Sequence, residues 1–150
     1  MKQTRKHGAA CVHARVSVFA VLAVLALPAF AADLEVTVQG VRGGDGQVRL
    51  ALFQREEGFR KEDKARQVLA LPASAGEVGG VFRDLPPGRY AVIAYHDENG
   101  DGKLNLRFGM FPKEGYGLSN NPEISGPPKF RDAAFEVKAD MHRLTIRLGY

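Results

Sequence analysis

Tyr90-Ala-Val-Ile-Ala-Tyr95 is the most apolar run of the chain beyond its first thirty residues. All of its side chains are apolar or aromatic, whereas a strand with one face in water alternates apolar and polar residues. The run follows Asp84-Leu-Pro-Pro-Gly88, which predicts a turn, because proline fixes φ near the value needed at the second position and glycine permits the reversal. We therefore expect residues 90–95 to form a central strand with both faces covered.

Six other segments show the spacing of strands, and with 90–95 they give about seven short strands. The glycine-rich turn 42–46 separates the first two, so we expect these to pair as an antiparallel hairpin. Gly79-Gly80 indicates a bulge or a sheet edge. The pattern contains no convincing amphipathic helix and predicts an all-β fold, an antiparallel β-sandwich of the transthyretin-like or immunoglobulin-like kind. The six segments are 34–39, 47–53, 67–71, 77–83, 134–137 and 143–148.

The start of the chain has the features of a secretory signal peptide. Four bases and no acid open it, residues 16–27 are nearly all apolar, and Ala29-Phe-Ala31 forms a cleavage site that frees Ala32. This apolar run is too short for a stable membrane anchor, which needs ~20 residues. We expect a signal peptide over 1–31, one domain over 32–150, and a periplasmic or secreted location.

Removal of the signal peptide leaves a domain without formal net charge. The chain has 21 Lys and Arg against 17 Asp and Glu, and the four bases of the signal peptide account for the excess. A nucleic-acid partner needs a clustered positive face to neutralise phosphates, and the sequence of residues 32–150 shows none. Cys11, the only cysteine, leaves with the signal peptide, so the domain has neither a disulfide nor a thiolate ligand for a metal.

A long connection, from Asp97 to Asp132, follows the predicted central strand. Loops longer than ~15 residues within a compact domain are usually functional or disordered. Aromatic residues are frequent in this connection, whereas disordered segments tend to lack them, so we expect it to be ordered and to pack on the sheets. In the alternative, the same rings form a platform for a sugar or a peptide. The rings are Phe108, Phe111, Tyr116 and Phe130.

The first part of this connection has the spacing of a calcium-binding loop. Calcium takes oxygen ligands, which alternate residues of a tight turn point at one centre, and a glycine permits the sharp bend. The twelfth position, where a glutamate should close the shell, holds Phe108, so Glu114 or Asp132 would have to fold back in its place. A plain turn, rich in the residues that turns favour, is the alternative. The candidate ligands are Asp97, Asn99, Asp101, the carbonyl of Lys103, and Asn105.

Other residues around this connection are candidates for a ligand site. His96 ends the predicted central strand, where a general base of a small hydrolase or lyase would sit. Ser119 lacks the Gly-x-Ser-x-Gly setting of a nucleophile, and the two histidines of the domain lack the spacing of a zinc site. We therefore expect a non-catalytic protein, with the His96 enzyme as the alternative. The candidate ligand-binding residues are His96, Phe108, Phe111, Glu114, Tyr116, Asn120 and Asn121.

Several motifs resemble those of known families. Leu85-Pro-Pro-Gly-Arg-Tyr-Ala-Val92 is similar to the turn and strand of transthyretin-like and carboxypeptidase-regulatory-like sandwiches. More specifically, the chain resembles domain of unknown function 2141, a family of exported bacterial proteins. The motifs that carry this resemblance are His96-Asp-Glu-Asn-Gly-Asp-Gly-Lys-Leu104, Pro112-Lys-Glu-Gly-Tyr-Gly117, Ser119-Asn-Asn121, Gly126-Pro-Pro-Lys-Phe130 and Ala133-Ala-Phe135.

The resemblance covers nearly all of residues 32–150. It implies a signal peptide, a single sandwich domain and a location in the envelope or outside the cell, with no assigned activity. The hydroxyisourate hydrolases share the transthyretin fold and end in Tyr-Arg-Gly-Ser, but this chain ends in Arg147-Leu-Gly-Tyr150, so that activity is not carried over. We expect a binding or structural module of the cell envelope, with calcium as the candidate cofactor and a sugar, a peptide or a protein as partner.

Overall fold

The computed structural model describes residues 31–109, 111–123, 125–138 and 140–150, so the predicted signal peptide lies, but for Ala31, outside the described residues. Most of the described chain is β-strand, with one short helix and one 3₁₀ turn. In chain order the elements are β1 (Ala32–Val41), β2 (Gln47–Phe53), η1 (Glu62–Lys64), β3 (Gln67–Pro72), β4 (Gly76–Leu85), β5 (Gly88–Asp97), β6 (Leu106–Arg107), β7 (Phe111–Pro112), β8 (Tyr116–Leu118), α1 (Phe130–Ala133), β9 (Phe135–Val137) and β10 (His142–Arg147).

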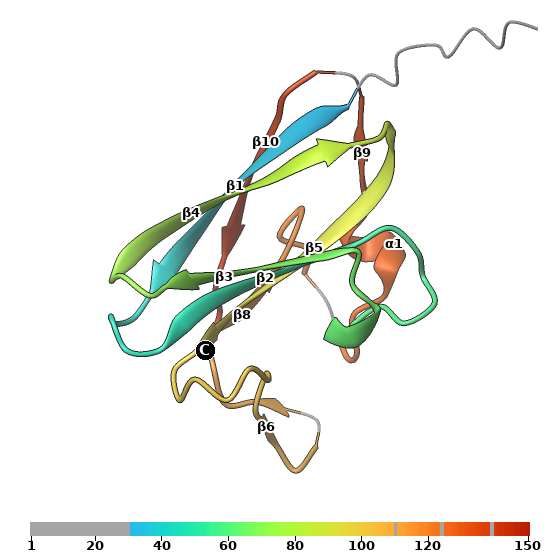
Figure 1. Ribbon diagram of the computed structural model, residues 1–150. Coiled ribbons are helices and arrows are strands. Elements are labelled where there is room, and N and C mark those ends of the chain that lie inside the picture. The colour runs from blue at the N-terminus through green and yellow to red at the C-terminus, as the bar shows by residue number, and fades with distance from the viewer. Residues whose placement is uncertain (1–30, 110, 124, 139) are drawn as a thin grey trace, which may run out of the picture.

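Two sheets make up most of the molecule (Figure 1). One has the strand order β10-β1-β4, and the other has the order β3-β2-β5-β8, with β9 also paired to β5. The short strands β6 and β7 form a separate hairpin. The prediction of a mostly β protein is confirmed, but the expectation of purely antiparallel pairing is wrong, because β1 and β10 run parallel. Alternation of apolar and polar residues suits a sheet face in either strand direction, so the sequence of β10 could not reveal this.

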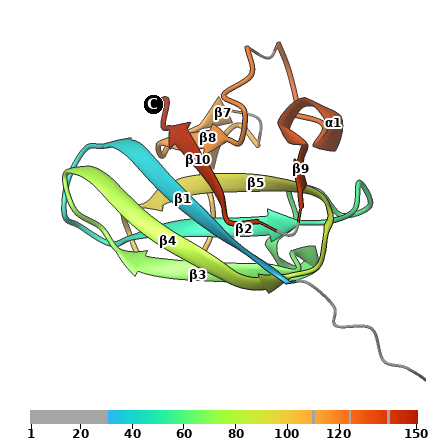
Figure 2. The same cartoon turned by 90° about the horizontal axis from the view of Figure 1, so that it is seen from above.

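The two sheets enclose one apolar core (Figure 2). Alternate residues of β1 and of β2 point into it, as the period of a half-buried strand requires. Burial of one such aliphatic side chain contributes roughly 1.5–3 kcal/mol. The fully buried core residues of these two strands are Leu34, Val36, Val38, Val48, Leu50 and Leu52.

The strand β5 is central, as its apolar sequence predicts. It lies between β2 on one side and β8 and β9 on the other. Tyr90, Val92 and Ala94 join the core between the sheets, whereas Ala91 and Ile93 join a second cluster on the opposite face, which α1 and the segment before η1 cover. Both faces of β5 are therefore shielded from solvent, and His96 and Asp97 lie at the carboxyl end of this buried strand.

The expected hairpin of the first two strands does not form. β1 pairs with β4 and β10, while β2 pairs with β3 and β5, so the connection after β1 crosses from one sheet to the other. The chain bends at Gly40, which has a φ of +84°, and the register with β4 shifts between Gln39 and Val41. Two amphipathic strands in sequence can pair edge to edge or face each other across the core, and here the second arrangement buries both apolar faces.

Gly79-Gly80 lies on a sheet edge, which is one of the two expectations for this pair, since β4 is the last strand of its sheet. Gly80 is buried, and a Cβ there would lie 2.9 Å from side-chain carbons of Leu50 and Leu71 in the facing sheet. The glycine therefore makes room for leucine side chains across the core. The register shifts of β4 against β1 fall at the ends of the strand and not at this pair.

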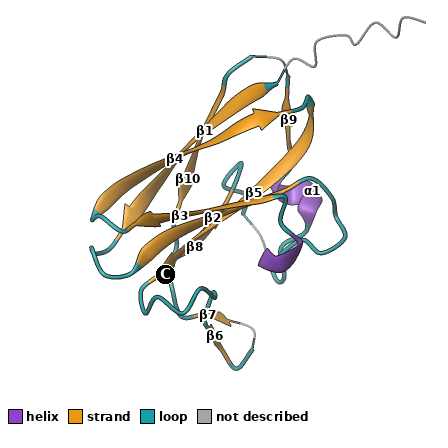
Figure 3. Ribbon diagram, in the orientation of Figure 1, coloured by secondary structure: helices purple, strands orange, loops and turns teal. Residues whose placement is uncertain are grey.

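The long connection after β5 folds back on the sheets, as expected (Figure 3). Its last part supplies β8, which pairs with β5, and begins α1, whose Phe130 is buried in the second cluster. Ser119 fixes this return: its hydroxyl accepts a hydrogen bond of 2.9 Å from the backbone N–H of Val92. The middle of the connection forms the β6–β7 hairpin, which stands away from both sheets in Figure 1.

Candidate functional site

Asp97 organises the oxygen-rich loop that follows β5. Its side chain is fully buried, and its two carboxylate oxygens accept hydrogen bonds from the backbone N–H groups of Asp101, at 3.1 Å, and Gly102, at 2.8 Å. The amide of Gln47, at the start of β2, donates a third hydrogen bond of 3.0 Å. A carboxylate that accepts hydrogen bonds from two N–H groups of the same turn fixes the curvature of that turn.

Asp101 and Asn99 continue this pattern at the tip of the loop. Asn99 accepts a hydrogen bond of 3.0 Å from the N–H of Asp101, and Asp101 accepts one of 2.8 Å from the N–H of Lys103. The side-chain amide of Asn105 donates to Asp101 at 3.0 Å. This last bond is the largest of the influences that lower the pKa of Asp101 below its usual value, because hydrogen bonds to a carboxylate favour its charged form.

Glu114 reaches back to the same loop from beyond the β6–β7 hairpin. One of its oxygens accepts a hydrogen bond of 2.9 Å from the N–H of Asn105, and the other accepts one of 3.3 Å from the N–H of Glu98. Asp132, the other acid considered for closing the loop, lies at the start of α1, where it accepts a hydrogen bond of 3.0 Å from the N–H of Lys129. Of these two acids, the structure therefore places Glu114 at the loop.

Two buried carboxylates thus hold one loop, and neither has a cationic partner among the described residues. Asp97 is 0% exposed and Glu114 is 6% exposed, and the salt bridges of the described residues involve other acids. Burial of a carboxylate is costly unless hydrogen bonds or an opposite charge compensate it. Hydrogen bonds from backbone N–H groups and from Gln47 provide that compensation, and no salt bridge of the described residues adds to it.

The described residues contain no group of three or more acids, histidines or cysteines placed to hold a metal ion. Asp97, Asp101 and Glu114 therefore do not converge as a set of three acidic ligands; calcium also accepts amide and backbone carbonyl oxygens, which can complete a site with fewer acids. Among the predicted ligands, the side chains of Asp97, Asn99, Asp101 and Asn105 all take part in hydrogen bonds within the loop. The assignment of these residues and of the Lys103 carbonyl as ligands stays a prediction.

A polar network beneath the loop fastens it to the sheet. The hydroxyl of Tyr95 donates its one proton to Glu62 at 2.6 Å, lies 3.2 Å from the carbonyl oxygen of Gly102, and accepts a hydrogen bond of 2.9 Å from Arg49. Arg49 also forms a salt bridge with Glu62. Burial, followed by the hydrogen bond to Glu62, raises the pKa of Tyr95, and Glu62 raises the pKa of Arg49. This network could not be predicted from the sequence, because its members are far apart in the chain.

His96 is buried and both of its ring nitrogens are engaged. Nε2 lies 2.8 Å from the carbonyl oxygen of Asp45, and Nδ1 lies 3.0 Å from the hydroxyl of Tyr150. The hydroxyl of Tyr150 also accepts a hydrogen bond of 3.1 Å from the N–H of Arg42, whose guanidinium lies 3.8 Å from the centre of the tyrosine ring. A general base needs a free nitrogen within reach of its substrate, and this ring presents none.

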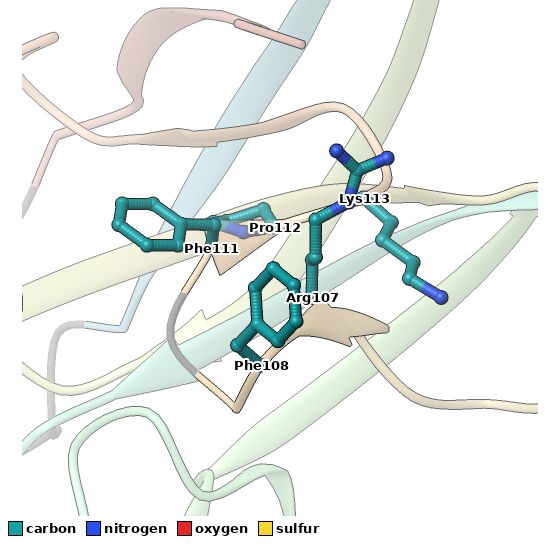
Figure 4. A pocket seen from close by; sticks show the side chains of 5 residues that line it. All are labelled: Arg107, Phe108, Phe111, Pro112 and Lys113. Atoms are coloured by element: carbon teal, nitrogen blue, oxygen red, sulfur yellow. The ribbon is translucent and has the colours of Figure 1, made fainter.

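The four aromatic residues of the connection divide into two kinds. Phe130 is buried, with its ring centre 5.7 Å from that of Phe59, and Tyr116 is half-buried opposite Tyr95. These two anchor the connection, as one of the two hypotheses expected. Phe108 and Phe111 are exposed on the β6–β7 hairpin, where they line an open hollow of about 620 Å³ with Arg107, Pro112 and Lys113 (Figure 4).

Asn120 and Asn121 form hydrogen bonds with other segments of the chain. Both have positive φ, at +66° and +44°, which asparagine tolerates better than most residues. The side chain of Asn121 accepts a hydrogen bond of 2.7 Å from the N–H of Arg147 and donates one of 2.8 Å to the carbonyl of Thr145, and Asn120 donates to the carbonyl of Ala134 at 2.9 Å. They fasten the turn after β8 to β10 and to the end of α1.

The arrangement defines a class of protein: a small, mostly β domain that presents an oxygen-rich loop and an aromatic hairpin beyond its central strand. The chain belongs to a family described as uncharacterized protein conserved in bacteria (DUF2141), which it matches over residues 36–145. The family resemblance of its motifs is thereby confirmed. Comparison with curated proteins and with solved structures gave no match. Within the part of the chain that the structure describes, no helix has both the length and the apolar character needed to cross a bilayer.

Proposed function

We propose that this protein is an exported, non-catalytic binding module of the bacterial cell envelope, and that calcium orders the loop which carries its binding surface. One observation supports the proposal above all others: Asp97 and Glu114, both buried, hold the backbone of the same loop, and neither has a cationic partner among the described residues. A divalent cation would supply the missing positive charge.

The chemistry of the donor set fits calcium. The ion takes six to eight oxygen ligands, from carboxylates, amides, backbone carbonyls and water. Each carboxylate oxygen has two lone pairs, so an oxygen that accepts one N–H can also face a cation. The residues that would hold the ion are Asp97, Asn99, Asp101, the carbonyl of Lys103, Asn105, and Glu114 in the role of the closing glutamate. Binding would have to draw the three carboxylates closer together, since they do not converge as placed.

Calcium would join the two ends of the segment that carries the β6–β7 hairpin. Asp97 lies before the hairpin and Glu114 lies after it, so an ion bound by both would fix the base of the hairpin. The ion's role in this proposal is structural, and the exposed residues of the hairpin provide the contact surface. His96, which the enzyme alternative requires as a base, has both nitrogens occupied by protein groups.

Thermal unfolding with calcium and with a chelator tests the proposal. A ligand that binds the folded state at ~100 times its Kd stabilises that state by about 2.7 kcal/mol, which raises the midpoint by several degrees. We expect such a rise for the wild type and none for Asp101→Asn, whose side chain is exposed and whose loss leaves the core intact. Equal midpoints of the wild type in calcium and in chelator would exclude a role for calcium.

Export is the second part of the proposal. The charged start, the short apolar run and Ala29-Phe-Ala31 support a signal peptide, and the two sheets around one core support a sandwich of the transthyretin-like kind. Expression of the full chain in a bacterium, followed by mass spectrometry of the extracytoplasmic protein, tests this part. We expect a chain that begins at Ala32 in the periplasm or the medium; an uncleaved chain in the cytoplasm would contradict it.

A further inference from the structure

The β6–β7 hairpin carries three large apolar side chains that are exposed to solvent. Phe108 is 85% exposed, Phe111 is 61% exposed and Leu106 is 42% exposed, and all three lie within six residues of one another. The hairpin projects from the body of the protein beyond the end of β8 (Figures 1 and 3). Large apolar side chains gathered on an exposed surface indicate an interaction site.

Cationic side chains accompany these apolar ones. Lys103 precedes the hairpin, Arg107 lies in β6 and Lys113 follows β7, whereas no acid occurs from residue 102 to residue 113. Arg107 and Lys113 line the same hollow as the two phenylalanines, and Figure 4 shows their charged ends pointing away from the ring of Phe111. The hairpin thus combines an apolar tip with positive charges around it.

We propose that the β6–β7 hairpin docks onto the surface of an anionic phospholipid bilayer, with the rings of Phe108 and Phe111 entering the headgroup region and the three cations facing lipid phosphates. This inference rests on the proposed function and names the partner of its binding surface. Aromatic side chains favour the boundary between headgroups and acyl chains, and basic residues near an anionic surface each add to the attraction.

The shape of the hairpin favours a bilayer over a protein partner. A stable protein interface buries about 800 Å² on each side, and a two-strand hairpin with two residues in each strand offers a narrow, convex tip. A small apolar tip can insert into a bilayer without a complementary groove, and an anionic bilayer also attracts the positive charges around the tip. The pairing of apolar rings with Arg107 and Lys113, which form no salt bridge among the described residues, matches that environment.

Calcium would strengthen this docking. The segment 97–114 contains one more acid than bases, and the acids lie at the base of the hairpin, not at its tip. A bound divalent cation would reverse the sign of the net charge of the segment, so that an anionic surface attracts the whole loop and not only its tip. Because the bound ion would neutralise these acids, calcium binding at the proposed metal site would favour docking onto an anionic bilayer.

Sedimentation with lipid vesicles tests the inference, using the protein produced from the full chain and purified in its extracytoplasmic form. The vesicles are phosphatidylcholine alone or phosphatidylcholine with phosphatidylglycerol, in calcium and in chelator. We expect binding to the anionic vesicles, strongest in calcium. Phe108→Ser with Phe111→Ser should weaken that binding at least about tenfold, and Arg107→Gln with Lys113→Gln about 25-fold, since each cation near an anionic surface is worth about fivefold.

Met141→Ser is the matched control, because Met141 is also an exposed apolar residue, at 60%, but lies before β10 and far from the hairpin in sequence. Its vesicle binding should equal that of the wild type, and all variants should keep the wild-type thermal midpoint in chelator. The inference is overturned if the wild-type protein does not bind anionic vesicles or binds neutral vesicles equally well. It is also overturned if both hairpin double variants bind anionic vesicles as tightly as the wild type does.

The two proposals fail in distinguishable ways. A calcium-induced rise in thermal midpoint without vesicles, together with no vesicle binding, retains the metal site and overturns the docking surface. Vesicle binding that depends on the phenylalanines but is equal in calcium and in chelator retains the docking surface and overturns its link to calcium.

Discussion

Glu114 accepts a hydrogen bond of 2.9 Å from the backbone N–H of Asn105, nine residues before it, across the base of the β6–β7 hairpin. This contact joins the end of the oxygen-rich loop to the strand that leads back into the sheet. It gives the loop a buried carboxylate at each end, since Asp97 holds the other.

Glu114→Gln is expected to separate the structural role of this side chain from its role toward a cation. The glutamine can still accept one of the two backbone hydrogen bonds, so the free energy of unfolding in chelator should fall by only about 1 kcal/mol. The rise in midpoint on adding calcium should be lost, because a neutral amide cannot close the ligand shell as a bidentate carboxylate does. A variant that responds to calcium as the wild type does would remove Glu114 from the site.

Tyr95→Phe tests the network beneath the loop. Loss of the hydroxyl removes the hydrogen bond to Glu62 and the polar contact with the carbonyl of Gly102, and leaves Arg49 with one partner fewer. The expected loss is about 1–3 kcal/mol of unfolding free energy in urea, because partly buried groups lose their partners. The control is Tyr116→Phe, which alters another tyrosine hydroxyl of the same sheet and should change this free energy by less than about 0.5 kcal/mol.

Gly117→Ala is expected to be strongly destabilising. A Cβ at this position of β8 would collide with the backbone carbonyl oxygen of Arg147, which cannot move without disturbing β10. Overpacking of this kind costs about 1–3 kcal/mol or more. Gly79→Ala in β4 is the matched control, because no atom lies within 4 Å of its added Cβ. An equal loss of unfolding free energy in both variants would show that the contact with Arg147 is not the cause.

Alkaline pH should destabilise the protein through its buried tyrosines. Burial is the main cause that raises the pKa of Tyr90 and of Tyr95, whereas an unfolded tyrosine titrates near 10. Their contribution to stability is therefore fully present below pH ~10 and is lost as pH rises through the folded pKa. Urea midpoints measured from pH 8 to 11 should fall above pH ~10, and less steeply for Tyr95→Phe; the same slope in both proteins would contradict the assignment to Tyr95.

The central strand could be predicted because its signal is local. Residues 90–95 are apolar without interruption, and only a strand with both faces covered tolerates that composition. The partners of the strands could not be predicted in the same way. The apolar residues of β1 and β2 indicate which face of each strand is buried, but not whether the two strands lie side by side or in facing sheets. In the structure they lie in facing sheets.

The candidate site shows the same limit. The spacing of Asp97, Asn99 and Asp101 is a local pattern and could be read directly. The return of Glu114 depends on the β6–β7 hairpin, and the engagement of His96 depends on Tyr150, which lies 54 residues further along the chain. Contacts of this kind arise from the tertiary fold and leave no periodic trace in the sequence.

Isothermal titration of calcium into the purified protein, beside the variants Asp101→Asn and Glu114→Gln, tests the central claim most directly. We predict one calcium ion bound per wild-type chain, with affinity at least about 100-fold lower in each variant, because each loses a carboxylate that the proposal places at the ion. No binding heat from the wild type at two different temperatures, together with an unchanged thermal midpoint, would contradict the claim.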